Sequence, residues 1–301
     1  MISNSVITAM VITVVISALA MIVPFGIIFF TSRKKETGAW SSLGLGVLGQ
    51  FWSQYLLLIP VVALLTIFGW FKNLSTDNSY YLLYVIITSI ILVILAALGM
   101  VWGVWLMNRH TPSLYRAMCT GIGFAGVKVF SLIVSYVSYI GYCKEINSTG
   151  IEVFKSNMLS NSNTLDAESV DNLIRQLTDA NVINLIMEGI NIVFMVAVEV
   201  ALAALIYEGL IRKKLLKAAV IATGINFVYV FAGTVIGALS TDKLGNIISK
   251  NTGSIIYDVF MLIWGLVSIW FVYGAVCRYK IVLKEGPYAH YAYFEKKDNE
   301  A

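Results

Sequence analysis

The chain has 301 residues, of which 58% are hydrophobic and 13% are charged. This composition excludes a soluble globular domain, because about 25% of the residues in such a domain are charged. We interpret the formal net charge of +4 as a consequence of membrane topology, and we expect no nucleic-acid partner.

Seven apolar blocks follow one another along the chain, separated by shorter polar segments. Each block can form a membrane-spanning helix, which needs about 20 residues to cross a hydrocarbon core of about 30 Å. The predicted fold class is therefore an all-α polytopic membrane protein, with about seven spans in residues 1–278 and a cytoplasmic tail in residues 279–301. The blocks cover residues 5–31, 41–70, 80–107, 117–143, 182–211, 216–240 and 254–277.

Lysine and arginine gather in every second connection between the blocks. The basic clusters fall at residues 33–35, 109–116 and 212–217 and in the tail from Arg278 onward. The other connections are poor in basic residues or balance them with acids. Since basic residues near helix ends remain on the cytoplasmic side, this pattern predicts an external N-terminus and a cytoplasmic C-terminus.

The connection of residues 144–181 is the one segment between blocks that is long enough for structure of its own. Apolar residues at helical spacing predict a short amphipathic helix at about residues 164–180, with Thr164 as its N-cap and Asp166 in its first turn. This helix either packs on the outer ends of the spans or serves as a lid or docking element. Residues 147–163 are rich in Asn, Ser and Thr, and we expect them to be flexible.

Polar residues inside the fifth block form a stripe. On a helical wheel they fall within an arc of roughly 80°, which must face protein or a cavity. Glu208 lies off this stripe, and we expect it at the interface beside Arg212. The stripe residues are Asn184, Glu188, Asn191 and Glu199.

Depth in the membrane links four blocks. Lys128, Glu199, Asn226 and the pair Ala96 and Ala97 all lie about ten to twelve residues from the cytoplasmic ends of their blocks. A buried Lys128 requires a counter-charge, and Glu199 is the carboxylate at its depth. Such a pair either holds helices together or lines a polar cavity.

Four segments in this order resemble a known family. Residues 121–128 read GIGFAGVK, which is similar to the G-x-G-H-G-G-x-E signature of the YhfC-like intramembrane metalloproteases, relatives of the PrsW and CAAX-processing (CPBP) proteases. Residues 95–100 (LAALGM) occupy the place of that family's Glu-Glu-x-x-Arg motif. Residues 199–207 and 222–227 resemble its Glu-Arg…His and His-x-x-x-Asp-Phe segments.

The resemblance implies a protease whose metal ligands and general base have been replaced. Glu199 is retained, and the histidines of the chain, His110 and His290, both lie outside the apolar blocks. We therefore expect no catalytic residues, no bound metal and no cofactor. The positions at which this chain differs from the expected Glu, Arg, His or Asp are Ala96, Ala97, Met100, Phe124, Lys128, Val200, Tyr207, Ala222 and Asn226.

Three functions remain open at this point. The favoured one is a non-catalytic protease homologue of a bacterial inner membrane, which binds a membrane protein or a transmembrane or lipidated peptide, or serves as a subunit of a membrane complex. A transporter or permease subunit with a polar cavity at mid-membrane is the second. An active peptidase that uses Glu188 and Glu199 as a coupled pair is the third.

Overall fold

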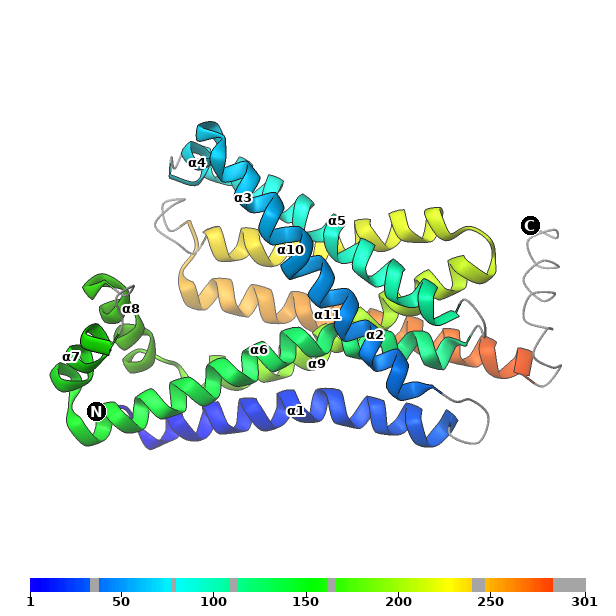
Figure 1. Ribbon diagram of the computed structural model, residues 1–301. Coiled ribbons are helices and arrows are strands. Elements are labelled where there is room, and N and C mark those ends of the chain that lie inside the picture. Colours follow the sequence, from blue (N-terminus) through cyan, green and yellow to red (C-terminus); the bar gives the residue numbers. More distant parts are fainter. Residues whose placement is uncertain (33–37, 77–79, 109–112, 162–165, 240–246, 284–301) are drawn as a thin grey trace. The chain divides into compact units, whose positions relative to one another are not determined.

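The computed structural model describes residues 1–32, 38–76, 80–108, 113–161, 166–239 and 247–283. Within these ranges every regular element is a helix, and seven helical segments are long and apolar enough to cross a membrane (Figure 1). The predicted all-α polytopic fold is confirmed, while the direction of the termini stays a prediction. The seven spans are Asn4–Thr31, Ala39–Ile67, Tyr81–Asn108, Leu114–Thr149, Val182–Ile211, Leu215–Leu239 and Asn251–Arg278.

The second span changes its helical geometry in the middle. Helix α2 (Ala39–Phe51) continues into a π-helical stretch, η1 (Trp52–Leu58), and then into α3 (Ile59–Ile67). Pro60 has no backbone N–H and its ring collides with the carbonyl one turn earlier, so regular α-helical bonding cannot pass through it. The wider π turn that comes just before Pro60 is one way in which a helix accommodates such a break.

The remaining elements complete the described chain. Two compact units are distinguished within it: Met1–Ile22 with Lys128–Val193, and Val23–Val127 with Phe194–Ala301. We call these the first and the second unit. The other helices are α1 (Asn4–Ser32), α4 (Gly69–Thr76), α5 (Tyr81–Asn108), α6 (Leu114–Thr149), α7 (Ile151–Asn161), α8 (Ala167–Thr178), α9 (Val182–Ile211), α10 (Leu215–Leu239) and α11 (Lys250–Leu283).

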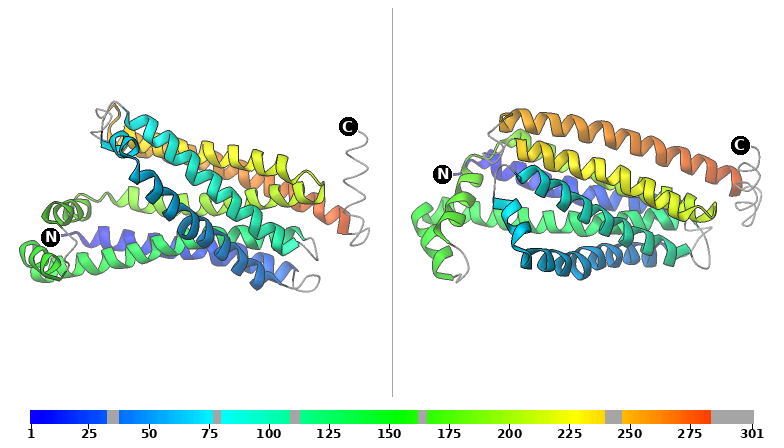
Figure 2. Two further views of the ribbon diagram at one scale, coloured as in Figure 1. Left: turned by 45° about the horizontal axis from the view of Figure 1, so that its top comes forward. Right: turned by 90° about the horizontal axis from the view of Figure 1, so that it is seen from above.

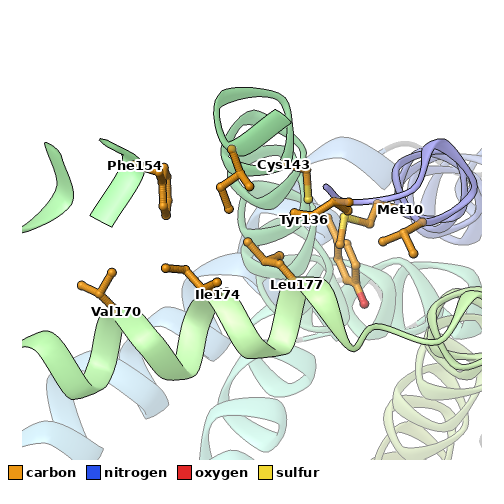
Figure 3. Close-up of a cluster of buried hydrophobic side chains, with 10 residues drawn as sticks. Met10, Tyr136, Cys143, Phe154, Val170, Ile174 and Leu177 are labelled. Atoms are coloured by element: carbon orange, nitrogen blue, oxygen red, sulfur yellow. The ribbon is translucent and has the colours of Figure 1, made fainter. Parts of the chain in front are cut away.

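The core of the first unit joins the start of α1 to the helices of the long connection. Val170, Ile174 and Leu177 project from one face of α8 toward Phe154 of α7 and Cys143 of α6 (Figure 3). Five other buried members of this cluster are Ile2, Val6, Met10, Tyr136 and Ile146. Helix α8 therefore buries its apolar face within its own unit.

The start of the chain is tied to the end of α6. The side-chain amide of Asn147 donates to the carbonyl of Ile2 at 2.9 Å, and its oxygen accepts from the Ile2 N–H at 2.7 Å. Both backbone groups of Ile2 are thereby satisfied by one side chain, which fixes the N-terminal segment beside the cluster.

The expectation of a flexible segment at residues 147–163 is wrong for residues 147–161, while residues 162 and 163 lie outside the described ranges. Helix α6 continues to Thr149 and α7 covers Ile151–Asn161. Gly150, with φ of 87°, separates the two helices, and burial of Phe154 fixes α7 against the cluster. The N-cap of α8 is Asp166, whose side chain accepts from the Ser169 N–H at 2.7 Å, whereas Thr164 lies outside the described residues.

In the second unit, α10 lies between α5 and α11, as the two views of Figure 2 show in yellow, teal and orange. The α10 residues Ala218, Ala222 and Asn226 are buried, and they recur every four residues on one face of the helix. Small side chains at two of these positions allow a close approach of neighbouring helices, which is common between membrane spans.

Candidate functional site

The positions that the resemblance assigns to protease chemistry fall on four helices. On α5, Ala96 and Met100 are each 2% exposed, and Ala97 is half-buried. On α6, Phe124 is 1% exposed. On α9 and α10, the buried residues of this set are Glu199, Val200, Tyr207, Ala222 and Asn226. All of these residues belong to the second unit.

Phe124 lies where α2, α5 and α6 meet. A Cβ built on Gly49 of α2 would stand 2.7 Å from the carbonyl oxygen of Gly99 on α5 and 3.8 Å from the Phe124 ring. A Cβ on Gly46 would stand 2.7 Å from the backbone nitrogen of Phe124. The three backbones are therefore in direct contact around the residue that replaces the expected histidine.

The backbone of α9 at Glu199 packs directly against α6. A Cβ on Gly121 of α6 would lie 2.8 Å from both the Glu199 carbonyl oxygen and the Val200 Cα. Two glycines of the segment 121–128 thus allow close helix contacts: Gly121 lets α6 approach α9, and Gly123 lets it approach the backbone of Leu43 on α2. The residue is 2% exposed, and its Oε2 is buried.

Two tyrosines near Glu199 were missed by the sequence analysis. The side chain of Tyr229 on α10 is hydrogen-bonded to Tyr257 on α11, and Tyr229 also interacts electrostatically with Glu199. Tyr257 packs over Gly233, where a Cβ would meet its ring at 3.0 Å. The available signal was Tyr229 itself, a phenol one turn from Asn226 in an apolar block.

Asn226 has an unsatisfied polar atom. The residue is 4% exposed, and its Oδ1 has no hydrogen-bond partner among the described residues. A buried acceptor without a donor costs about 1–3 kcal/mol. The second unit therefore keeps a destabilising polar group at a position that the family resemblance singles out.

The polar stripe of the fifth block is divided between the units. Asn184 and Glu188 are exposed and Asn191 is buried, all in the first unit, whereas Glu199 lies in the second. Tyr136 of α6 donates a hydrogen bond to the Glu188 carboxylate.

Lys128 is half-buried at the boundary of the first unit, and Glu199 belongs to the second. Their predicted pairing stays a prediction.

Glu208 forms an ion pair that joins α9 to α11. The guanidinium of Arg278 contacts the carboxylate through two nitrogens, and its Nε lies 3.1 Å from Oε1. The expectation placed Glu208 beside Arg212, which lies four residues later and just beyond the end of α9. The pair with Arg278 connects residues 70 positions apart, which no local pattern predicts.

The described residues do not provide a cluster of side chains that could ligate a metal ion. Over the described residues, no group of three or more His, Cys, Asp and Glu side chains is arranged to hold a metal ion. The apolar residues at the expected ligand positions supply no donor atoms.

Comparison with known proteins identifies the family. A family model described as the YhfC intramembrane metalloprotease matches residues 19–237. No curated protein and no solved structure matches the chain. The match covers six of the seven apolar spans in whole or in part, so the chain is an integral, multi-pass membrane protein. It belongs to the YhfC intramembrane metalloprotease family.

Proposed function

We propose that this family member is a pseudoprotease of a bacterial inner membrane, which binds a membrane partner without cleaving it. The partner would be a transmembrane or lipidated peptide, or another subunit of a membrane complex. The observation that carries the proposal is the packing of Ala96, Met100, Phe124 and Ala222, which are buried side chains at positions where the family resemblance implies chemistry.

The metal ion that the family description implies does not fit these residues. A catalytic zinc ion takes three protein ligands with nitrogen, oxygen or sulfur donors and keeps one position for water. The side chains of Ala96, Phe124 and Ala222 offer no such donor, while Glu199 and Asn226 supply one carboxylate and one amide. We therefore derive no hydrolytic step at this site.

Asn226 supports partner binding rather than a purely structural role. Its unsatisfied Oδ1 would be relieved by an N–H group from an incoming segment. Buried polar groups are otherwise expected to find partners within the protein. The neighbouring Glu199, Tyr229 and Tyr257 make the same part of the second unit polar.

Asn226→Leu tests the proposal, with Val228→Leu as the control. Val228 lies on the same helix and is 46% exposed. Removing an unsatisfied polar atom is expected to leave thermal stability unchanged or raised, because the cost of burying it disappears. A loss of the co-purifying polypeptide in Asn226→Leu would then reflect lost recognition rather than unfolding. Val228→Leu is expected to retain the polypeptide.

Two results would contradict the proposal. One is an equal yield of every co-purifying polypeptide from the wild type, Asn226→Leu and Val228→Leu. The other is cleavage of a membrane peptide by the reconstituted protein that disappears in Glu199→Gln, which would establish the active-peptidase alternative.

The predicted Lys128–Glu199 pair is tested by a double-mutant cycle. Lys128→Ala alone is expected to lower the yield of folded protein, because a buried carboxylate would lose its counter-charge. Lys128→Ala combined with Glu199→Ala is expected to restore part of that yield. Additive defects in the double variant would exclude the pair.

A further inference from the structure

Two glutamines of the second span carry buried polar atoms without a hydrogen-bond partner among the described residues. Gln50 of α2 is 2% exposed, and its Oε1 is one of these atoms. Gln54 of η1 is half-buried, and its Nε2 is the other. The hydroxyl of Ser53, which lies between them in the chain, donates to the Gln50 backbone carbonyl at 2.9 Å. The unmet hydrogen-bonding demand of this segment is therefore confined to the two amides.

The two glutamines continue a face of the span that begins in contact with α6. Gly46, Gln50 and Gln54 recur every four residues, so they share one face. At Gly46 this face touches the backbone of α6, because a Cβ there would stand 2.7 Å from the Phe124 nitrogen. The span also packs on α5 along α2 and η1. Neighbouring helices therefore close this face at Gly46.

The protein cover over the face thins toward α3. Gln50 is buried, whereas Gln54 and Leu58, which follow at intervals of four residues, are half-buried. Helix α3, the next element along the span, has no buried residue. Gln54 and Leu58 also belong to the π-helical stretch, a geometry that is frequently found at functional sites. A ligand that approaches along α3 therefore reaches Gln54 first and Gln50 behind it.

The chemistry of the two amides defines the ligand. A carboxamide carries donors and an acceptor whichever way it is turned, so a ligand that satisfies both side chains must offer N–H and C=O groups together. An acyl chain offers neither group. An unbroken transmembrane helix uses its backbone N–H and C=O groups in its own hydrogen bonds. A peptide whose helix is interrupted leaves both kinds of group unpaired at the interruption.

We propose that the face of Gly46, Gln50 and Gln54 binds a membrane-spanning peptide at an interruption of its helix. A peptide N–H donates to the Gln50 oxygen, and a peptide carbonyl accepts from the Gln54 nitrogen. Each bond gives a partner to a buried polar atom that lacks one, which removes an unfavourable state from both molecules. The site contains none of the residues on which the proposed function rests, so either proposal can fail without the other.

Two synthetic peptides test the proposal in proteoliposomes that contain the full chain. Both are lysine-flanked leucine–alanine peptides with about 20 apolar residues, which is enough to span the bilayer. One carries Gly-Pro at its centre, where proline removes a helical hydrogen bond. A diazirine residue beside the centre crosslinks each peptide to the protein under light, and mass spectrometry locates the crosslinks. The interrupted peptide is expected to crosslink to η1 and α3 at about tenfold lower concentration than the continuous peptide.

Gln50→Leu and Gln54→Leu remove the amides one at a time, and Tyr55→Phe is the control. Tyr55 is 45% exposed and follows Gln54 directly, so it lies on a different face of the span. Each Gln→Leu variant is expected to weaken binding of the interrupted peptide about tenfold, because a peptide group would stay unpaired in a buried site. Binding of the continuous peptide is expected to stay unchanged, and Tyr55→Phe is expected to bind both peptides as the wild type does.

Three results would overturn the proposal. The first is equal crosslinking of the two peptides to the wild type, at any level. The second is a preference for the interrupted peptide that survives when Gln50→Leu and Gln54→Leu are combined. The third is a loss of thermal stability in both single variants without peptide, because removal of an unpaired polar atom leaves stability unchanged or raised. Such a loss would show that the amides are already bonded within the protein.

Discussion

A methyl group added at Gly46 is expected to force α2 and α6 apart. The new Cβ would lie 2.7 Å from the Phe124 nitrogen and 2.9 Å from the Thr120 carbonyl carbon, with the Thr120 oxygen closer still. These are backbone atoms of a helix, which cannot rotate away as a side chain can. Relief requires one helix to shift by about 1 Å, and overpacking of this kind costs about 1–3 kcal/mol.

Gly44 provides a control on the same helix. A Cβ at Gly44 would meet nothing within 4 Å, so Gly44→Ala adds a methyl group without a clash. Alanine is favoured over glycine inside a helix by about 0.5–1 kcal/mol. Gly46→Ala is therefore expected to destabilise the protein while Gly44→Ala leaves it unchanged or slightly stabilised.

The free energy of unfolding is measured in a mild detergent by pulse proteolysis across a denaturant series. The two variants are expected to differ by about 1.5–4 kcal/mol, which is the sum of the two effects. Equal stabilities would refute the close packing of α2 on α6. They would also refute the burial of Phe124 in a closely packed junction of α2, α5 and α6.

Three further predictions concern contacts outside that junction. Hydrogen bonds from Ser169 hold the pKa of Asp166 below its usual 3.8, so the stabilisation of α8 is present at neutral pH and lost as the pH falls through the lowered value. Protection of the α8 amides from hydrogen exchange, corrected for intrinsic rates, should therefore fall with pH in the wild type. Asp166→Asn should remove this pH dependence. Arg278→Ala and Glu208→Gln should each cost about 1–3 kcal/mol of stability, and together less than the sum. Asn147→Ala should cost about 1–2 kcal/mol, because two hydrogen bonds to the N-terminal backbone disappear, and hydrogen exchange near residue 2 should accelerate.

The seven spans were predictable because length and apolar composition suffice to define a membrane helix. The same reasoning failed at α7, where Asn and Ser residues indicate a loop and a single buried aromatic residue, Phe154, fixes the helix. Segments outside the apolar blocks depend on tertiary contacts that composition does not encode. The tie between Asn147 and Ile2 is one such contact, between residues 145 positions apart.

The candidate site was predictable in its residue types more than in its contacts. Motif spacing singled out Phe124, Glu199 and Asn226, and each proves to be buried in the second unit. The partners were not predictable, because the packing of Gly49 on Gly99 and the bond of Tyr229 to Tyr257 depend on how helices rotate about their axes. Hydrophobic periodicity is nearly uniform around a membrane helix, so the sequence carries little information about that rotation.

The metal content of the purified protein tests the central claim most directly. Wild type and Glu199→Gln, purified in mild detergent without chelators, are compared by elemental mass spectrometry. The pseudoprotease account predicts no stoichiometric zinc in either protein. One equivalent of zinc in the wild type that is absent from Glu199→Gln would contradict it and restore an active metalloprotease.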